Sequence, residues 1–209
     1  MAAPQLLVQT SLGELGGKIS TAVTGESARA FLNVPYAAPP LGALRFKEPQ
    51  PPLPWAGTRD ATAYGKEPVQ GDEGRLPFQV PRGEGRDPET DLPSYMGEDS
   101  LTLNIFTPTT EAGRDAGPLP VLFYIYGGGF NNGAGSLPMY DGTRLANRQG
   151  GAVVVAINYR LAALGFLYKP GGDIPANIGL LDMIAALRWV QKEIAAFNGD
   201  AERCENSPV

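Results

Sequence analysis

Six apolar or aromatic residues run without interruption over positions 121–126 and end in three consecutive glycines, 127–129. An apolar run of this length without alternation predicts a β-strand buried on both faces. The glycines allow the backbone to turn sharply and to approach another group closely, because they carry no Cβ atom. Their amides are then available to point at an anion or a developing oxyanion. A tight turn after a core strand is the simpler interpretation, and this stretch alone leaves both open.

A second apolar run, at positions 152–157, predicts another buried strand. Between the two runs, residues 141–148 predict a short helix with Asp141 as its N-cap. Two buried strands joined by about 25 residues that include a helix form a βαβ unit. We therefore expect the two strands to lie parallel in one sheet, with a right-handed crossover.

Other segments predict further strands and one long helix. Residues 5–32 contain short strand patterns around a turn at 11–13, and residues 28–34 and 101–107 predict two more strands. The best helix is 179–197, and it ends at Asn198-Gly199. Its apolar side chains recur every three or four residues and form one stripe that we expect to face the core: Met183, Leu187, Val190, Ile194 and Phe197. Residues 201–209 are polar and show no strand signal.

Seven prolines fall within residues 35–54. A polyproline ligand for an SH3-type domain is one interpretation. A rigid surface connection is the better one, because large side chains lie between and beside the prolines and are placed to anchor the segment to a core: Tyr36, Leu44, Phe46 and Trp55.

Residues 65–97 are polar, and a stretch of this length is either a lid, a binding loop or a disordered segment. Its acidic residues lack the spacing of metal ligands, so we expect a solvated loop there: Asp72, Glu73, Glu89 and Asp91.

Composition excludes several functions. The chain has 209 residues, a net charge of −5 and no prominent run of Lys or Arg, so nucleic acid and anionic membranes are not expected partners. No apolar run approaches the roughly 20 residues of a membrane helix. The start has no basic and apolar leader pattern, so we expect a cytoplasmic protein. One cysteine, Cys204, excludes an internal disulfide.

The chain contains no histidine. A Ser-His-Asp or Cys-His catalytic arrangement therefore cannot be completed within these residues. A zinc site that uses histidine is excluded as well, and one cysteine cannot form a thiolate cluster. We expect neither a metal nor a cofactor.

Several motifs occur together in a specific order. They are Val34-Pro35-Tyr36-Ala37, Leu44-Arg45-Phe46, Gly97-Glu98-Asp99-Ser100-Leu101-Thr102-Leu103-Asn104, Ile125-Tyr126-Gly127-Gly128-Gly129-Phe130, Asn158-Tyr159-Arg160, Leu164-Gly165-Phe166-Leu167 and Asn177-Ile178-Gly179-Leu180-Leu181-Asp182. In these residues the chain resembles the N-terminal part of a type-B carboxylesterase, the cholinesterase-like branch of the α/β-hydrolases. The resemblance covers residues 1–200 as a partial domain, and residues 201–209 form a divergent polar tail.

The resemblance implies a fold and a reaction. The fold is α/β, with antiparallel N-terminal strands that lead into a mostly parallel sheet. In the family, a serine on a strand-to-helix elbow attacks a carboxylic ester, a histidine takes its proton, and backbone amides stabilise the oxyanion. By motif, Gly128 and Gly129 would supply two of those amides. One donor of this kind contributes roughly 3–4 kcal/mol in other acyl-transfer enzymes. The implied partner is a small ester, and no oligomeric state follows.

The chain departs from the family pattern at its end and in two local positions. No G-x-S-x-G motif occurs, so the nucleophile, the acid and the histidine are missing, and we expect a fragment that is inactive alone. Ser100 stands where many relatives have the second cysteine of a disulfide, and Val69-Gln70 stands where the first is expected. Tyr126 replaces the commoner histidine before the glycines.

The resemblance also implies a sheet that stops before the nucleophile strand. In the family's strand order 1-2-4-3-5, residues 121–126 form the third strand, and its neighbour, the fifth, would carry the serine. Without that neighbour, residues 121–126 become an open apolar edge, which favours aggregation. We therefore expect marginal solubility.

Two other functions fit part of the pattern. A non-catalytic binding module, as in adhesion relatives of the family, would explain the absent triad. A dinucleotide-binding domain would explain glycines after a strand, but residues 131–138 do not open a helix and no acidic residue ends the next strand.

Overall fold

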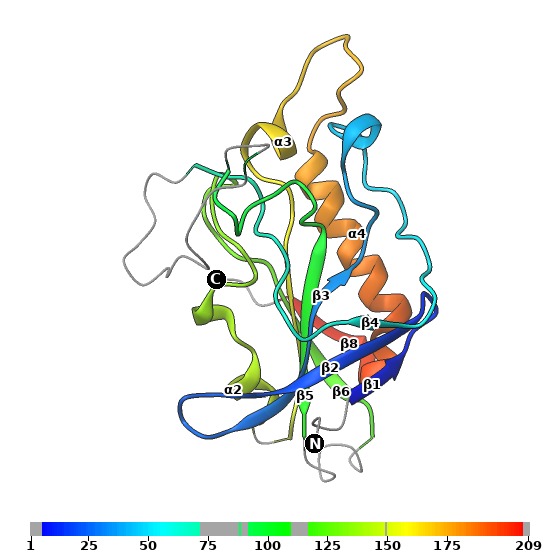
Figure 1. Cartoon of the computed structure of the whole chain (residues 1–209), viewed down its shortest axis with the longest axis vertical. Coiled ribbons are helices and arrows are strands. Elements are labelled where there is room, and N and C mark those ends of the chain that lie inside the picture. Colours follow the sequence, from blue (N-terminus) through cyan, green and yellow to red (C-terminus); the bar gives the residue numbers. More distant parts are fainter. Residues whose placement is uncertain (1–5, 72–87, 89–91, 110–116, 149, 207–209) are drawn as a thin grey trace.

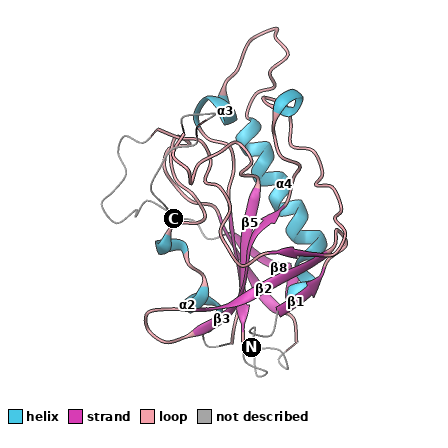
Figure 2. Cartoon of the chain, in the orientation of Figure 1, coloured by secondary structure: helices cyan, strands magenta, loops and turns pink. Residues whose placement is uncertain are grey.

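The computed structural model describes residues 6–71, 88, 92–109, 117–148 and 150–206. Eight strands form one sheet, with long loops grouped beyond one end of it (Figures 1 and 2). The strands are β1 (Leu6–Gln9), β2 (Glu14–Thr21), β3 (Ser27–Pro35), β4 (Thr58–Asp60), β5 (Thr102–Pro108), β6 (Leu119–Tyr124), β7 (Val153–Ile157) and β8 (Gly199–Asn206). The helices are α2 (Thr143–Ala146), α3 (Ala162–Phe166) and α4 (Ile178–Glu193), with 3₁₀ turns η1 (Gly42–Leu44), η2 (Pro138–Tyr140) and η3 (Ile194–Phe197).

The spatial order of the strands is β1-β2-β3-β5-β7-β6-β8, and β4 pairs with β2. Pairing is antiparallel from β1 through β7 and parallel for β6 with β7 and β6 with β8. When β4, which pairs only with β2, is left out, the five strands from β3 onward, numbered in chain order, lie in the order 1-2-4-3-5. The structure therefore confirms a partial α/β-hydrolase fold in which antiparallel strands lead into a parallel group.

Strands β6 and β7 lie between two apolar clusters, one on each face of the sheet. Every residue of β7 is buried, whereas β6 alternates buried and half-buried positions. Val121 and Phe123 point to the α4 side with Trp189 and Val190, where most of the core gathers. On the opposite face, Val154 joins a smaller cluster that includes Ala146 of α2. The prediction of a strand buried on both faces holds fully for β7 and partly for β6.

The long helix is confirmed, but its buried stripe differs from the prediction. Helix α4 is followed at once by η3, and Asn198 ends it with a φ of 65°. Leu187 is 39% exposed, because the helix turns Ala186 and Trp189 toward the sheet instead. Figure 1 shows α4 lying along one face of the sheet. The predicted helix at 141–148 is shorter, and its N-cap is Gly142, so the prediction of Asp141 as the N-cap is wrong by one residue. The Asp141 carboxylate still accepts a hydrogen bond of 2.8 Å from the Thr143 amide.

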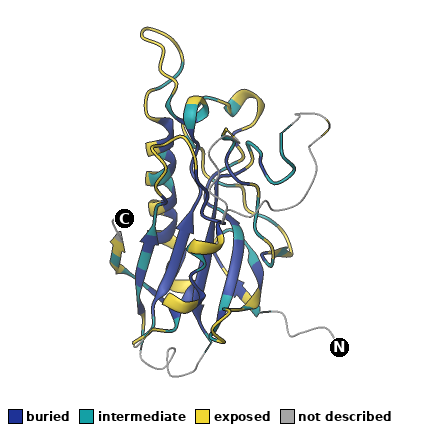
Figure 3. Cartoon of the chain, turned by 90° about the vertical axis from the view of Figure 1, so that its left-hand side faces the viewer, coloured by how far each residue is buried: buried dark blue, intermediate teal, exposed yellow. Residues whose placement is uncertain are grey.

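The prediction that no strand follows residue 200 is wrong for 201–206. Strand β8 pairs in parallel with β6, and Val121 lies opposite Cys204. Strand β6 is therefore an interior strand, and the predicted open edge at 121–126 does not exist. Figure 3 shows the C-terminal strand at the border of the sheet, coloured as exposed and intermediate. The hydrogen bonds between strands are made by the main chain and do not require apolar side chains. At the edge of a sheet, charged side chains such as that of Arg203 can reach solvent. An edge strand can therefore have a polar sequence that lacks the apolar pattern used to predict strands.

The proline-rich segment is anchored to the core as expected. The buried Tyr36 hydroxyl donates to the Asn158 carbonyl at 2.6 Å, and the Trp55 indole donates to the Glu14 carbonyl at 2.8 Å. The acidic residues considered at 65–97 lie outside the described residues. Within the described residues, no cluster of three His, Cys, Asp or Glu side chains could hold a metal ion. None of the helices in this described part has the length and apolar character that crossing a membrane requires.

Candidate oxyanion site

The glycine run forms an exposed turn just beyond the carboxyl end of β6. Gly128 has a φ of 135°, Gly129 of 60° and Phe130 of 61°. The Gly128 carbonyl accepts hydrogen bonds from the amides of Asn131 at 3.1 Å and Asn132 at 3.3 Å. A Cβ atom on Gly128 would lie 2.1 Å from the Asn132 carbonyl oxygen. The turn therefore requires glycine at 128 both for its backbone angle and for space.

The amides of Gly128 and Gly129 are free of main-chain pairing. Strand β6 ends at Tyr124, and neither amide donates to any group in the described chain. Both residues are exposed. In parallel sheets, ligands bind outside the carboxyl ends of the strands, and this is where the two amides lie. The arrangement can bind a small anion, and the assignment of these two residues as oxyanion donors stays a prediction.

A pair of stacked tyrosines supports the turn from below. The rings of Tyr126 and Tyr159 lie 4.6 Å apart at an interplanar angle of 18°. Each hydroxyl donates to the carbonyl of the other residue, at 3.3 and 3.2 Å. Burial raises the pKa of Tyr126 well above its ordinary value, and burial together with the nearby Tyr140 raises the pKa of Tyr159 to about 12. Both phenols are therefore neutral near pH 7, so Tyr126 serves as a packed support where the family more often has histidine.

The segment after the turn is fixed by side-chain amides from three distant parts of the chain. Gln70 donates to the Gly133 carbonyl at 2.9 Å and accepts from the Gly133 amide at 2.8 Å. Asn158 accepts from the Gly135 amide at 2.8 Å, and Asn104 donates to the Gly135 carbonyl at 3.2 Å. From the sequence, Gln70 stands only where many relatives have the first cysteine of a disulfide. Its role in holding this segment is therefore not predicted from the sequence.

A buried ion pair joins the end of β7 to α4. Arg160 donates to Asp182 through Nε at 2.8 Å, through a terminal nitrogen at 2.7 Å and through its own backbone amide at 3.1 Å. Burial raises the pKa of Asp182, and the hydrogen bonds and charge of Arg160 oppose that rise. The sequence signal was a charged residue at 182 on the face of the helix that also carries Ala186. From the sequence, Asp182 is identified only as the last residue of the motif that begins at Asn177.

Ser136 is not presented as a nucleophile. Its side chain is 1% exposed, and its hydroxyl donates to Glu67 at 3.3 Å. The residues around Gly135-Ser136 do not form the G-x-S-x-G motif either, so the local sequence and the burial agree.

The dinucleotide-binding alternative does not fit the structure. Residues 131–137 form turns, and the next helical element is the three-residue η2. A dinucleotide site needs a helix N-terminus directly after the glycines to face the pyrophosphate.

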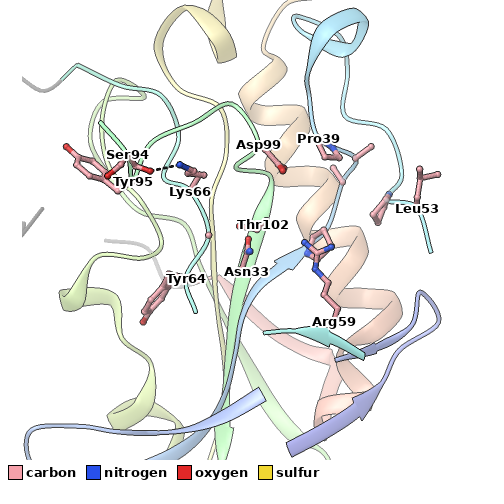
Figure 4. A pocket seen from close by; sticks show the side chains of 15 residues that line it. Asn33, Pro39, Leu53, Arg59, Tyr64, Lys66, Ser94, Tyr95, Asp99 and Thr102 are labelled. Atoms are coloured by element: carbon pink, nitrogen blue, oxygen red, sulfur yellow. Dashed lines mark hydrogen bonds between the residues drawn. The ribbon is translucent and has the colours of Figure 1, made fainter. Parts of the chain in front are cut away.

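Another hollow, of about 590 Å³, lies between β3, β4 with the loop before it, and residues 94–102 (Figure 4). It shares no lining residue with the glycine turn. Lys66 donates to the Ser94 carbonyl, and the Arg59 guanidinium lies 5.6 Å from the centre of the Trp55 ring. Figure 4 shows Lys66, Arg59 and Asp99 on different sides of the hollow. Charges of both signs are spread around it and do not converge on one point.

Comparisons with known proteins agree with the fold. A family model described as the carboxylesterase family matches residues 4–205. A cholinesterase of Mus musculus is 44% identical over 196 residues, which cover 93% of this chain and 30% of that protein. A fumonisin B1 esterase of Sphingopyxis macrogoltabida is 40% identical over 206 residues, which cover 96% of this chain and 34% of that protein. The chain thus spans about a third of the length of these relatives.

Solved structures give the same result. A PNB esterase superposes with a TM-score of 0.80 at 39% identity and covers 97% of this chain and 38% of its own. A thermophilic PNB esterase gives a TM-score of 0.80 at 38% identity with the same coverage. Because a family match extends over nearly all of its residues, the chain belongs to the carboxylesterase family.

Proposed function

We propose that this chain supplies the oxyanion-stabilising half of a carboxylic ester hydrolase site. The observation that carries the proposal is the pair of exposed, unpaired amides at Gly128 and Gly129. They follow the strand that lies next to β8, the fifth strand of the order 1-2-4-3-5. Donors that are already aimed before the reaction stabilise a tetrahedral intermediate without a reorganisation cost at that moment.

The nucleophilic half is proposed to lie outside these 209 residues. The sequence has no histidine, so proton transfer by a Ser-His-acid triad has no base here. Strand β8 occupies the place of the nucleophile strand, but its residues contain no G-x-S-x-G motif. The chain alone would therefore bind a small oxyanion weakly and would not turn over an ester.

Two measurements test the two halves of this proposal. A p-nitrophenyl ester assay on the 209-residue chain should give no hydrolysis above the background rate. Hydrolysis that an organophosphate abolishes would show a complete serine site and overturn the proposal. In a ¹⁵N-labelled sample, added acetate should shift the amide resonances of Gly128 and Gly129 saturably. If neither resonance moves, the anion-binding half is wrong.

A matched pair of variants controls the acetate experiment. Gly129→Pro removes one donor and also disturbs the turn, because proline cannot adopt the φ of 60° found there. Gly25→Pro makes the same two changes in the β2–β3 turn, where φ is 96° and the amide donates to the Ala22 carbonyl at 2.9 Å. The first variant should weaken the acetate-induced shift of Gly128, and the second should leave it unchanged.

A further inference from the structure

An open hollow of about 500 Å³ lies directly beside the glycine turn. Among the described residues, seven line it and none of these is charged; we call it the phenylalanine hollow: Gly129, Phe130, Asn131, Ala162, Ala163, Phe166 and Leu167. Gly129 belongs both to this hollow and to the pair of free amides. An acceptor oxygen bound at the amides would therefore carry any attached group past the wall of the hollow.

Two aromatic rings form the main apolar wall. The centroids of Phe130 and Phe166 lie 4.9 Å apart at an angle of 43°. Phe130 is nevertheless 48% exposed, and Leu167, which also lines the hollow, is 42% exposed. Large apolar side chains that gather around a hollow on the surface commonly mark a binding site. Here the exposed apolar surface is continuous with Gly129.

The wall is held by unusual backbone geometry. Phe130 has a φ of 61° and Ala162 has a φ of 47°, and residues other than glycine rarely adopt such positive values. The Ala162 amide donates to the Phe130 carbonyl at 2.8 Å, so the two strained residues hold each other. Strain of this kind persists where the surrounding structure fixes it, and it gathers at functional sites.

Helix α4 supports the second ring. A Cβ atom on Gly179, at the start of α4, would lie 2.6 Å from Cζ of Phe166. The ring therefore rests directly on the first turn of the helix. The wall is supported by α4 on one side and by the Phe130–Ala162 contact on the other, so its shape is set before a ligand arrives.

We propose that the phenylalanine hollow holds an uncharged alkyl or aryl group of the ester, next to the carbonyl oxygen that the glycine amides bind. The inference rests on the proposed function, because it assigns the amides and the hollow to one ligand. The uncharged lining disfavours an ionic group, which would lose its hydration without a partner. A ligand with both an acceptor oxygen and an apolar tail uses both halves of the surface at once.

Linear carboxylates test this assignment, because each carries an acceptor group and a tail of chosen length. A titration of the ¹⁵N-labelled chain with acetate, butyrate and hexanoate should shift the Gly128 and Gly129 amides in every case. The dissociation constant should fall by about two- to fourfold per added methylene, as expected for a tail that becomes partly or fully buried. Hexylammonium has the tail without the acceptor, so it should leave the amide of Gly128, which does not line the hollow, unshifted.

Two variants connect the length dependence to the wall. Phe130→Asn removes the ring and keeps a residue that tolerates the left-handed backbone, whereas Phe166→Leu keeps an apolar side chain and removes the ring contact. Phe130→Asn should abolish the gain from butyrate to hexanoate. Phe166→Leu should reduce that gain. Met139→Ala, at an exposed apolar residue outside the hollow, is the matched control and should change nothing.

The outcomes separate the inference from the proposed function. If all three carboxylates bind equally through the glycine amides, the hollow is not part of the site and the proposed function stands. If no carboxylate shifts the glycine amides, both fail. The amide resonances of the residues that line the hollow are also recorded at several protein concentrations without carboxylate. If they change with concentration, a second copy of the chain covers the hollow and the inference is wrong.

Discussion

Gly128 and Gly129 have positive φ values, but their surroundings differ. A Cβ atom on Gly128 would strike a backbone oxygen, whereas one on Gly129 would meet nothing within 4 Å. Gly128→Ala should therefore lower the free energy of unfolding by roughly 2–4 kcal/mol, and Gly129→Ala by only about 1 kcal/mol for its left-handed backbone. Urea denaturation of both variants measures the difference. Equal losses would contradict the geometry of the turn.

The buried ion pair between Arg160 and Asp182 should be costly to break on one side only. Asp182→Asn leaves the Arg160 charge buried without its partner and should lower the free energy of unfolding by about 3–5 kcal/mol. The double variant Arg160→Met with Asp182→Leu should lose less, since it leaves no buried charge. Chemical denaturation of the single and double variants provides the test. A double variant less stable than the single one would contradict this account.

The raised pKa of Tyr159 predicts that the chain loses stability at high pH. Its pKa is raised from 10.0 to about 12, chiefly by burial, so the folded state holds the phenolic proton more tightly than the unfolded chain does. The contribution is complete below about pH 10 and is lost as the pH rises toward about 12. The free energy of unfolding should fall across this window in the native chain. The fall should be smaller in Tyr159→Phe. Tyrosinate absorbance is recorded in parallel to follow the deprotonation. Identical stability profiles for the native chain and the variant would contradict this role of Tyr159.

At the scale of elements, the apolar strands and the long helix could be predicted from sequence, because burial leaves a regular pattern in their residues. The strand over 152–157 and the helix end at Asn198 are where the pattern placed them. Strand β8 could not be predicted, since its pairing comes from the main chain and its side chains are polar. The glycine turn was found from three adjacent glycines. Gln70 was not recognised, because its partner Gly133 is 63 residues away and no local pattern links them.

Strand β8 should protect β6 from contact with other chains. Alternate residues of a strand donate toward a given neighbour, so one of the two variants Cys204→Pro and Glu205→Pro loses a hydrogen bond to β6. That variant should expose the apolar edge of β6 and aggregate more, as measured by light scattering and size-exclusion chromatography. Cys204→Ser keeps the main-chain donor and should behave like the native chain. Unchanged behaviour of both proline variants would show that β8 does not protect β6.

At the scale of the whole molecule, one group of exposed apolar side chains lies together on α4. Leu180, Ile184 and Leu187 are 38–44% exposed on the outer side of the helix. The sequence predicts marginal solubility from an open edge at β6, but β8 pairs with that edge. We predict instead that these side chains on α4 limit the solubility of the chain. Ile184→Glu with Leu187→Lys should raise the concentration at which the chain begins to scatter light and leave its melting temperature within a few degrees. Val23→Thr, at an isolated exposed residue, is the control and should have no effect.

The place beside β6 is filled by a segment that contributes few side chains to the core. Among residues 201–205, Ala201 and Cys204 are half-buried and the other three are exposed. A synthetic peptide with an apolar strand sequence would offer the same backbone partners and bury more surface, so it should compete with β8 for that place. We therefore expect the sheet of this chain to accept an added strand in place of β8.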